Sequence, residues 1–376
     1  MKIIDIETKA LRIPYKTPFH WAHGVIEAAD VVLVCVHTDE GITGYGESMS
    51  SASADAVQLL LREVRKICIG RSPFEISAIL REAYQYLFSS RGNCSAPRFG
   101  ALVLTGLDMA LWDVVGKATN RAVHELLGGA VRNRIQYFGF PQGDTAEEVA
   151  QDAGRWAQSG SDVIYVKIGR GEALDLAIVE QVRAAIGNRR LRLDANEAWD
   201  PLTARRMINV LARFEIEFIE QPTNSDSLAA LRQVKAQSSI AIAADQLVFT
   251  PEDVYAVCCR QAADLIVLGL HETGGIGRFC KAAAIAEAAG INVCLHGLYE
   301  TGITTCASNQ VGATLTNLDD GNQFMNHLLV EDIIKSPGLS LHKGQLPVLS
   351  GPGLGFELDW DAVARAEEVY RTQSQG

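Results

Sequence analysis

The sequence predicts an α/β protein in which an N-terminal α+β module precedes a parallel (β/α)8 barrel. Two observations lead to this prediction. After about residue 130, short apolar segments alternate with helical segments at fairly even intervals, as repeated β/α units do. Before that point, strand-like segments are followed by amphipathic helices, as in an antiparallel sheet covered by helices. A doubly wound sheet is the alternative for the second half.

The N-terminal module is expected to begin with antiparallel strands within residues 1–15 and 30–48. A turn at Asp39–Gly41 interrupts the second segment, because glycine and aspartate favour the backbone conformations of tight turns. Apolar residues at helical spacing then predict helices over Ala54–Ile69 and Gly106–Lys117.

The second half contains seven countable strands and a weaker eighth, which fit a barrel of typical size. Each strand is a short apolar run that ends in polar residues, and a helical segment follows it. The expected strands are 134–140, 161–169, 190–196, 217–222, 240–246, 263–269 and 291–297, followed by the weaker one over 323–329.

Acidic side chains recur where three successive strands end. Asp194 ends the first, Glu220 follows after 26 residues and Asp245 after a further 25, so each interval is one β/α unit. The C-terminal ends of neighbouring barrel strands meet at the mouth where active sites form, so these carboxylates should converge. Converging anions require a cation, and oxygen ligands favour Mg²⁺, with Mn²⁺ or Ca²⁺ as alternatives. Taken singly, each residue could instead cap a helix or pair with an arginine.

Two other strand ends carry candidate catalytic bases. Lys167 interrupts an apolar strand one unit before Asp194, and His296 ends the strand two units after Asp245. These strands flank the metal-binding strands, so the two side chains should face one cavity from opposite sides. Partial burial and a nearby cation disfavour the ammonium form of lysine, and histidine titrates near neutral pH. The structural alternative is a surface lysine and a core histidine.

Composition narrows the class of ligand. The 376 residues carry a formal net charge of -11 and 48% hydrophobic content, which gives no basic surface for nucleic acid or an anionic membrane. No signal peptide or apolar run near 20 residues is evident, so we expect a cytoplasmic protein that does not contact a membrane. The eight cysteines are scattered without CxxC spacing, which indicates reduced thiols. A small molecule is therefore the expected partner.

Several motifs together resemble the enolase superfamily, in its mandelate racemase and muconate lactonizing enzyme branch, over essentially the whole chain. They are GITGYGE at Gly41, GLDMALWDVVGKATNRAVHELLGG at Gly106, VKIG at Val166, LRLDAN at Leu191, FIEQP at Phe218, AADQ at Ala243, TGGIG at Thr273 and GPGLGFELDWDAVAR at Gly351. The resemblance implies a capping domain over residues 1–125, a modified (β/α)7β barrel over 126–345 and a segment over 346–376 that returns to the cap. It also implies a homo-oligomer.

The resemblance further implies a reaction. Mg²⁺ at Asp194, Glu220 and Asp245 would bind the carboxylate of a small substrate, and a base would remove the neighbouring α-proton to give an enolate. TGGIG alone could suggest a phosphate cradle, but a lone glycine motif is weak and a tight turn explains it.

The chain departs from the family pattern at informative positions. Family members often show KxK at the end of the second strand, and here Tyr165 replaces the first lysine while Lys167 keeps the second. The muconate branch has a lysine, and the racemase branch an aspartate, where this chain has Gly269. His296 is thus expected to lack an aspartate partner, which puts its tautomer in doubt. Gln323 stands where many members have a glutamate.

These departures favour a dehydratase that acts on a sugar acid or on a hydroxy amino acid such as a hydroxyproline. The alternatives are a racemase or epimerase of a 2-hydroxy or amino acid, a cycloisomerase, a barrel that binds a carboxylate without catalysis, and a phosphate-binding barrel. The residues expected to contact substrate are Tyr165, Asn196 and Gln323, together with Phe19, His20, Trp21 and His23 of an irregular loop, Thr17–Gly24, over the barrel mouth. Aromatic residues in this loop favour a small or partly apolar substrate, although they could instead form a dimer contact.

Overall fold

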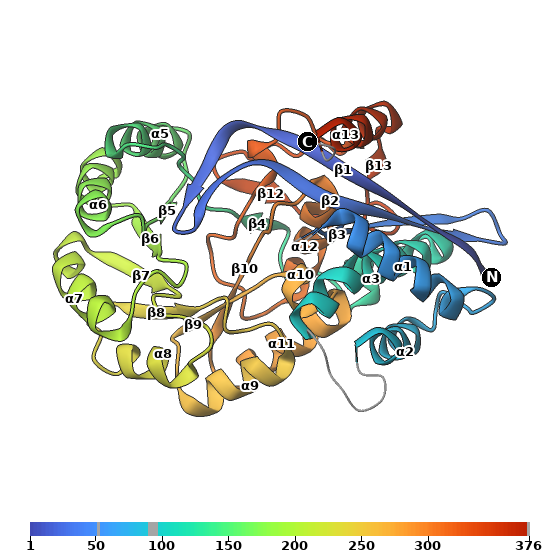
Figure 1. Ribbon diagram of the computed structural model, residues 1–376, viewed down its shortest axis with the longest axis horizontal. Coiled ribbons are helices and arrows are strands. Elements are labelled where there is room, and N and C mark those ends of the chain that lie inside the picture. The colour runs from blue at the N-terminus through green and yellow to red at the C-terminus, as the bar shows by residue number, and fades with distance from the viewer. Residues whose placement is uncertain (51–52, 89–96, 374–376) are drawn as a thin grey trace.

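A computed structural model describes residues 1–50, 53–88 and 97–373, in which an antiparallel sheet with its helices lies beside a curled parallel sheet (Figure 1). This arrangement confirms the predicted α/β class, with a modified barrel and an N-terminal cap. The last three residues of the predicted C-terminal segment, 374–376, lie outside the described residues.

The N-terminal sheet consists of three antiparallel strands in the order β1-β2-β3. They are β1 (Ile3–Trp21), β2 (Gly24–Thr38) and β3 (Thr43–Met49), and the helices that follow are α1 (Ala54–Cys68), α2 (Ile76–Phe88), α3 (Pro97–Thr119) and α4 (Val123–Leu126). Two glycines of β3 allow α3 to lie directly on the sheet, since a Cβ on Gly44 or Gly46 would come within 2.1 Å of a carbonyl oxygen of α3. Any larger residue at either position would push the helix off the sheet.

Helix α3 corrects one expectation from the sequence. Its stretch Arg98–Thr119 is long and apolar enough to cross a membrane by length and composition, so the statement that no such run exists was wrong. In the structure 89% of an apolar 18-residue window within that stretch is buried inside the protein. A helix covered on nearly all sides is apolar on nearly all sides, which explains the composition.

The parallel sheet has six strands in the order β10-β9-β8-β7-β6-β5. They are β5 (Val163–Lys167), β6 (Arg190–Asp194), β7 (Ile216–Glu220), β8 (Ala241–Ala244), β9 (Leu265–Leu268) and β10 (Asn292–Leu295). The helices between and beside them are α5 (Ala146–Gln158), α6 (Glu172–Ile186), α7 (Pro201–Leu211), η2 (Ala212–Phe214), α8 (Leu228–Lys235), α9 (Pro251–Arg260), α10 (Leu270–Thr273), α11 (Ile276–Ala288) and α12 (Gly302–Thr314). The chain curls with its helices outside (Figure 1).

Isolated parallel bridges close the sheet into a ring. Val293 of β10 pairs with Leu318, Asn322 pairs with Tyr137, and Gly139 pairs with Ile164 of β5. The expected first strand, 134–140, is thus a short β4 (Arg134–Gln136) followed by single bridges. Because no ladder extends beyond these bridges, both closing segments are weaker strands than the sequence pattern suggested.

The prediction of an eighth strand over 323–329 was wrong. Residues 318–322 carry the bridges of the eighth position, and Asn326–Leu328 form the 3₁₀ helix η3. The remaining elements are β11 (Ile334–Ser336), β12 (Gln345–Pro347), β13 (Glu357–Leu358) and α13 (Trp360–Gln373). Helix α13 lies along β1, where Lys9 Nζ is 2.9 Å from Glu367 Oε2. The domain limits at residues 125 and 345 stay a prediction.

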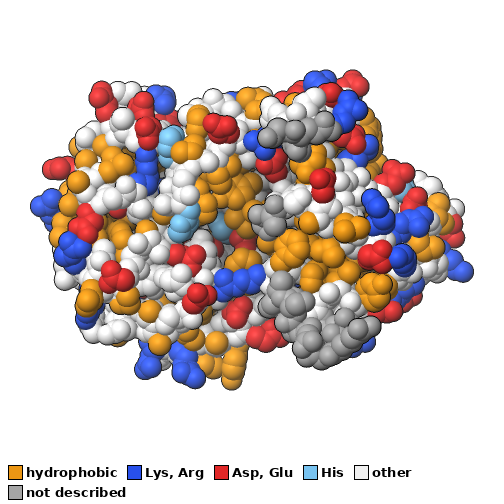
Figure 2. Space-filling view, viewed as in Figure 1, with side chains coloured by type: hydrophobic (Ala, Val, Ile, Leu, Met, Phe, Trp, Pro, Cys, Tyr) orange, Lys and Arg blue, Asp and Glu red, His pale blue; other side chains and the backbone are white. Residues whose placement is uncertain are grey.

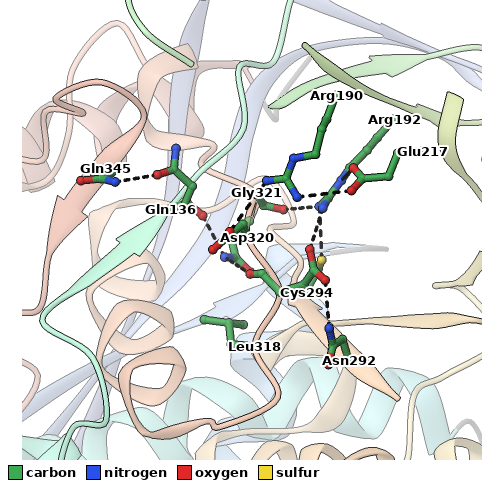
Figure 3. Close-up of polar contacts among 12 residues, drawn as sticks. Gln136, Arg190, Arg192, Glu217, Asn292, Cys294, Leu318, Asp320, Gly321 and Gln345 are labelled. Carbon is green, nitrogen blue, oxygen red and sulfur yellow. Dashed lines mark hydrogen bonds and ion pairs between the residues drawn. The ribbon is translucent and has the colours of Figure 1, made fainter. Parts of the chain in front are cut away.

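A buried arginine joins β6 to the closing segment (Figure 3). Arg192 is 1% exposed, and its guanidinium lies 2.7 Å from Glu217 Oε2, 2.7 Å from Asp319 Oδ1 and 2.7 Å from the carbonyl oxygen of Gly321. Each nitrogen of the guanidinium thereby has a partner, which a buried cation requires.

We expect Arg192→Met to lower the free energy of unfolding by about 3 kcal/mol, because a buried ion pair loses its cation and its acceptors stay behind. The matched control is Arg190→Met, whose guanidinium contacts Glu217 but is 39% exposed, and which should cost less than about 1 kcal/mol. Urea unfolding of both variants measures the difference. Equal costs would show that Arg192 does not hold the ring closed.

Candidate active site

Three carboxylates meet at the C-terminal ends of adjacent barrel strands. Asp194 and Glu220 are the last residues of β6 and β7 and pair in register, and Asp245 directly follows β8. One oxygen atom from each lies within 4.8 Å of the other two, and all three side chains are buried. The sequence spacing therefore predicted a convergence that the parallel sheet produces.

The electrostatics of this triad are those of a site for a cation. Burial, followed by the charges of Asp194 and Asp245, raises the pKa of Glu220 well above its usual range. Burial is also the main cause that raises the pKa of Asp245 to about 7. Asp245 Oδ2 is buried and has no hydrogen-bond partner among the described residues. An oxygen-only donor set with an unpartnered oxygen fits Mg²⁺ or Mn²⁺.

Tyr165 and Lys167 of β5 both contact the triad. Lys167 Nζ lies 2.5 Å from Asp194 Oδ2, and the Tyr165 hydroxyl donates to Asp194 Oδ2 at 2.6 Å and to Glu220 Oε1 at 2.8 Å. Tyr165 was expected to meet the substrate, but its ring is buried and stacks on Phe138 with centroids 4.3 Å apart. Its hydroxyl therefore contacts two carboxylates of the triad, and Tyr165 is not among the described residues that line the cavity.

No aspartate stands at position 269, as the sequence indicated, but His296 has carboxylate partners from other positions. His296 Nδ1 lies 2.6 Å from Glu272 Oε1 and 3.3 Å from Asp245 Oδ1. A Cβ on Gly269 would lie 1.7 Å from Glu272 Oε2, so the carboxylate of Glu272 fills the space that a side chain at position 269 would occupy. The sequence signal was Glu272 itself, three residues after the glycine on the short helix α10.

Two carboxylates, Asp245 and Glu272, decide the charge of the histidine. Burial alone lowers the pKa of His296, but the carboxylates of Asp245 and Glu272 outweigh it and raise this pKa to about 10. A protonated imidazole with Nδ1 bonded to Glu272 leaves Nε2 as the nitrogen that can exchange a proton with a ligand.

We expect Glu272→Gln to lower the pKa of His296 and to slow any proton transfer by this ring by about 10²-fold, since a charged acceptor no longer orients it. The basic limb of the pH profile should move to lower pH, which a purely structural role would not cause. Gly269→Asp combined with Glu272→Ala places a carboxylate in the same space and should restore part of the rate. An unchanged pH profile in Glu272→Gln would contradict this role.

A cavity of about 240 Å³ opens beside these groups, and both Lys167 and His296 line it. Phe19, Trp21 and His23 also line it, as expected. His20 does not, because successive strand residues point to opposite faces, and its Nδ1 lies 3.4 Å from Asp144 instead.

The stretch Thr17–Gly24 is not an irregular loop. Trp21 pairs with Gly24 and Phe19 with Ile26 across the tip of the β1–β2 hairpin, which reaches over the barrel mouth (Figure 1). A register shift between Pro14 and Phe19 made the strand pattern hard to recognise in the sequence. Hydrophobic and histidine side chains gather near the middle of this face of the molecule (Figure 2).

The remaining cavity wall combines expected and unexpected residues. Asn196 and Gln323, which the sequence suggests as substrate contacts, also line the cavity. The residues that sequence reasoning missed are Met49, Leu102, Glu197, Gln246, Phe249, Leu298, Tyr299 and Met325. They come from both the cap and the barrel, and no local pattern signals which loops of two modules will meet. Most of the cavity wall is apolar. Lys167 and His296 line it at two positions, and the carboxylate triad lies beside it.

Comparisons with known proteins agree with this geometry. Residues 148–362 match the family described as enolase C-terminal domain-like, and residues 3–128 match the mandelate racemase / muconate lactonizing enzyme N-terminal domain. The two matches together span the cap and the barrel.

Similar proteins are isomerases. The chain is 31% identical to muconate cycloisomerase 1 of Rhodococcus opacus, covering 96% of this chain and 98% of that protein. It is 30% identical to the L-Ala-D/L-Glu epimerase of Bacillus subtilis, covering 95% and 97% respectively. The structure of a dipeptide epimerase from Enterococcus faecalis, complexed with Mg and the dipeptide L-Leu-L-Tyr, superposes with a TM-score of 0.87 at 29% identity and covers 95% of this chain and 100% of that one.

Proposed function

The chain belongs to the mandelate racemase / muconate lactonizing enzyme branch of the enolase superfamily, and we propose that it is a Mg²⁺-dependent racemase or epimerase of a small carboxylate. The observation that carries the proposal is the placement of Lys167 and His296 in one cavity beside the carboxylate triad. Two bases on different strands allow one to remove an α-proton and the other to return a proton to the opposite face.

The residues of this chain have separate roles in the proposal. A divalent cation held by Asp194, Glu220 and Asp245 would neutralise the substrate carboxylate and stabilise the negative charge that develops when the α-proton leaves. Lys167 Nζ removes the proton from one face, and His296 Nε2 donates to the other. Glu272 holds the imidazole, while Phe19 and Trp21 of the hairpin tip exclude water.

Gly269 argues against the cycloisomerase alternative, even though a cycloisomerase is among the similar proteins. The muconate branch was expected to carry a lysine at this position, and here the space holds the carboxylate of Glu272. The carboxylate of Glu272 is negative where the lysine would be positive. A cycloisomerase mechanism that uses this lysine therefore has no equivalent group in this chain.

A second candidate is the dehydratase expected from the sequence, which the relatives support less well because those named above are isomerases. One observation favours it. The carboxylates of Glu272 and Asp245 keep His296 protonated, and a protonated imidazole can expel a β-hydroxyl as water after the α-proton has left. Both candidate reactions begin with removal of the α-proton. His296 then protonates the α-carbon in the racemase and the leaving β-hydroxyl in the dehydratase.

Deuterium exchange tests the proposal. The Mg²⁺-loaded protein should be incubated in D₂O with enantiopure amino acids, hydroxy acids and their β-hydroxylated forms, and followed by proton NMR and polarimetry. A racemase exchanges the α-proton and loses optical rotation, and a dehydratase instead releases a keto acid or an imine. A barrel that only binds carboxylates would exchange nothing, which would overturn the proposal.

A further inference from the structure

We propose that Glu197 selects carboxylate substrates that carry a positively charged nitrogen, an inference that rests on the proposed function and narrows its substrate class. Glu197 lines the same cavity as Lys167 and His296. Three features support the proposal. The carboxylate of Glu197 is held in place, the cationic side chains of the cavity are already paired, and buried acceptor atoms without donors lie on the same wall.

The backbone after β6 holds Glu197 at the cavity wall. Asn196 and Glu197 have φ angles of 42° and 67°, in the left-handed region that non-glycine residues rarely adopt. The amide of Glu197 donates to the carbonyl of Gln221 at 2.8 Å, and its Oε1 accepts from the amide of Ser225 at 2.5 Å. Bonds to two neighbouring loops fix the turn, so the carboxylate does not move freely into solvent.

The charges of the cavity wall leave Glu197 without a counter-ion. Lys167 pairs with Asp194, and His296 pairs with Glu272. Glu197 makes no ion pair of 4.0 Å or less among the residues that the structure describes. Arg98 contacts Ser225, with Nη1 3.3 Å from its Oγ, but the guanidinium lies over the ring of Phe249 and makes no ion pair of 4.0 Å or less with Glu197. A cation on the ligand would supply the missing charge.

Unpartnered acceptors on the same wall point to a ligand with several N–H donors. Asn196 Oδ1 and Gln246 Oε1 are buried without hydrogen-bond partners within the described part of the chain. Both residues line the cavity. A protonated primary amine offers three N–H donors to such acceptors and a protonated secondary amine offers two, whereas a hydroxyl offers one. Buried acceptors left without donors weaken binding, so the wall favours the nitrogen ligand.

The same wall disfavours substrates with a second negative group. Among the residues that the structure describes, no arginine and no lysine besides Lys167 lines the cavity, and both Lys167 and His296 are already paired. A dicarboxylate or a phosphorylated acid would bring an uncompensated anion close to Glu197. The inferred class is therefore an amino or imino acid in its zwitterionic form.

The test compares matched pairs of probes with the Mg²⁺-loaded full chain. Each 2-amino acid in a panel is paired with the 2-hydroxy acid of the same carbon skeleton, and a cyclic imino acid is paired with its ring-oxygen analogue. We expect α-proton exchange in D₂O to favour the nitrogen member by roughly 10- to 100-fold in kcat/KM, as a charge-assisted hydrogen bond would give. Glu197→Gln should remove most of this preference by raising KM for the nitrogen member alone.

Glu180→Gln on the exposed face of α6 makes the same change of charge and should leave the preference intact. Equal exchange of both members by the wild type, or an equal loss for both in Glu197→Gln, would overturn the selectivity while the proposed function stands. Absence of exchange with every member of both series would overturn the proposed function itself. Thermal shifts with each probe give a readout of binding that does not depend on turnover.

Discussion

Glu220→Gln is expected to abolish Mg²⁺-dependent exchange of the substrate α-proton, with a loss of at least about 10³-fold. A divalent cation contributes several kcal/mol of charge stabilisation, and each 1.4 kcal/mol corresponds to about tenfold in rate. Glu220 is 1% exposed and lies between Asp194 and Asp245, so the substitution removes one of the three carboxylates that would hold the cation. Deuterium exchange and titration calorimetry with Mg²⁺ measure the two effects.

The same substitution should stabilise the metal-free protein at neutral pH. The folded-state pKa values of Glu220 and Asp245 are raised, that of Asp245 from 3.8 to about 7, so folding binds protons between these values. Stability of the metal-free wild type therefore falls as pH rises from about 4 to 7, and Mg²⁺ should restore it. Glu220→Gln removes part of this slope. Full activity after exhaustive chelation, or a higher Mg²⁺ affinity in the variant, would contradict the metal site.

Lys167→Ala and His296→Asn are each expected to reduce turnover by about 10²- to 10⁴-fold, the usual cost of losing a positioned acid or base. Each side chain serves one face of the α-carbon in the proposed mechanism. One variant should therefore still exchange the α-proton of one enantiomer without inversion, or without loss of a β-hydroxyl. Chiral chromatography combined with proton NMR separates exchange from inversion.

Lys281→Ala and His342→Asn change the same residue types at exposed positions and serve as controls that should keep near-normal turnover. The metal-free Lys167→Ala variant also tests the ion pair with Asp194, because an unpaired buried carboxylate should lower stability at neutral pH. Near-normal turnover in His296→Asn with an inactive Lys167→Ala would reject the two-base mechanism and leave Lys167 acting alone.

The sequence determined the order of the barrel elements and the convergence of the carboxylate triad. Parallel strands end at one side of a sheet, so the intervals from Asp194 to Glu220 and Asp245 suffice to place these carboxylates together. The same reasoning placed Lys167 and His296 on strands that flank the triad. The spacing of apolar residues and the order of the strands along the chain can both be inferred from a single sequence.

The tertiary structure alone decided the partner of His296 and the wall of the cavity. The carboxylate of Glu272 occupies the space that a side chain at position 269 would fill. The sequence shows only a glycine at that position, so it suggests that the carboxylate is missing. Met49 and Leu102 of the cap meet Glu197 and Phe249 of the barrel only after the modules associate. Such contacts arise from close packing between segments distant in the chain, where the fit of shapes rather than any local pattern determines the neighbour.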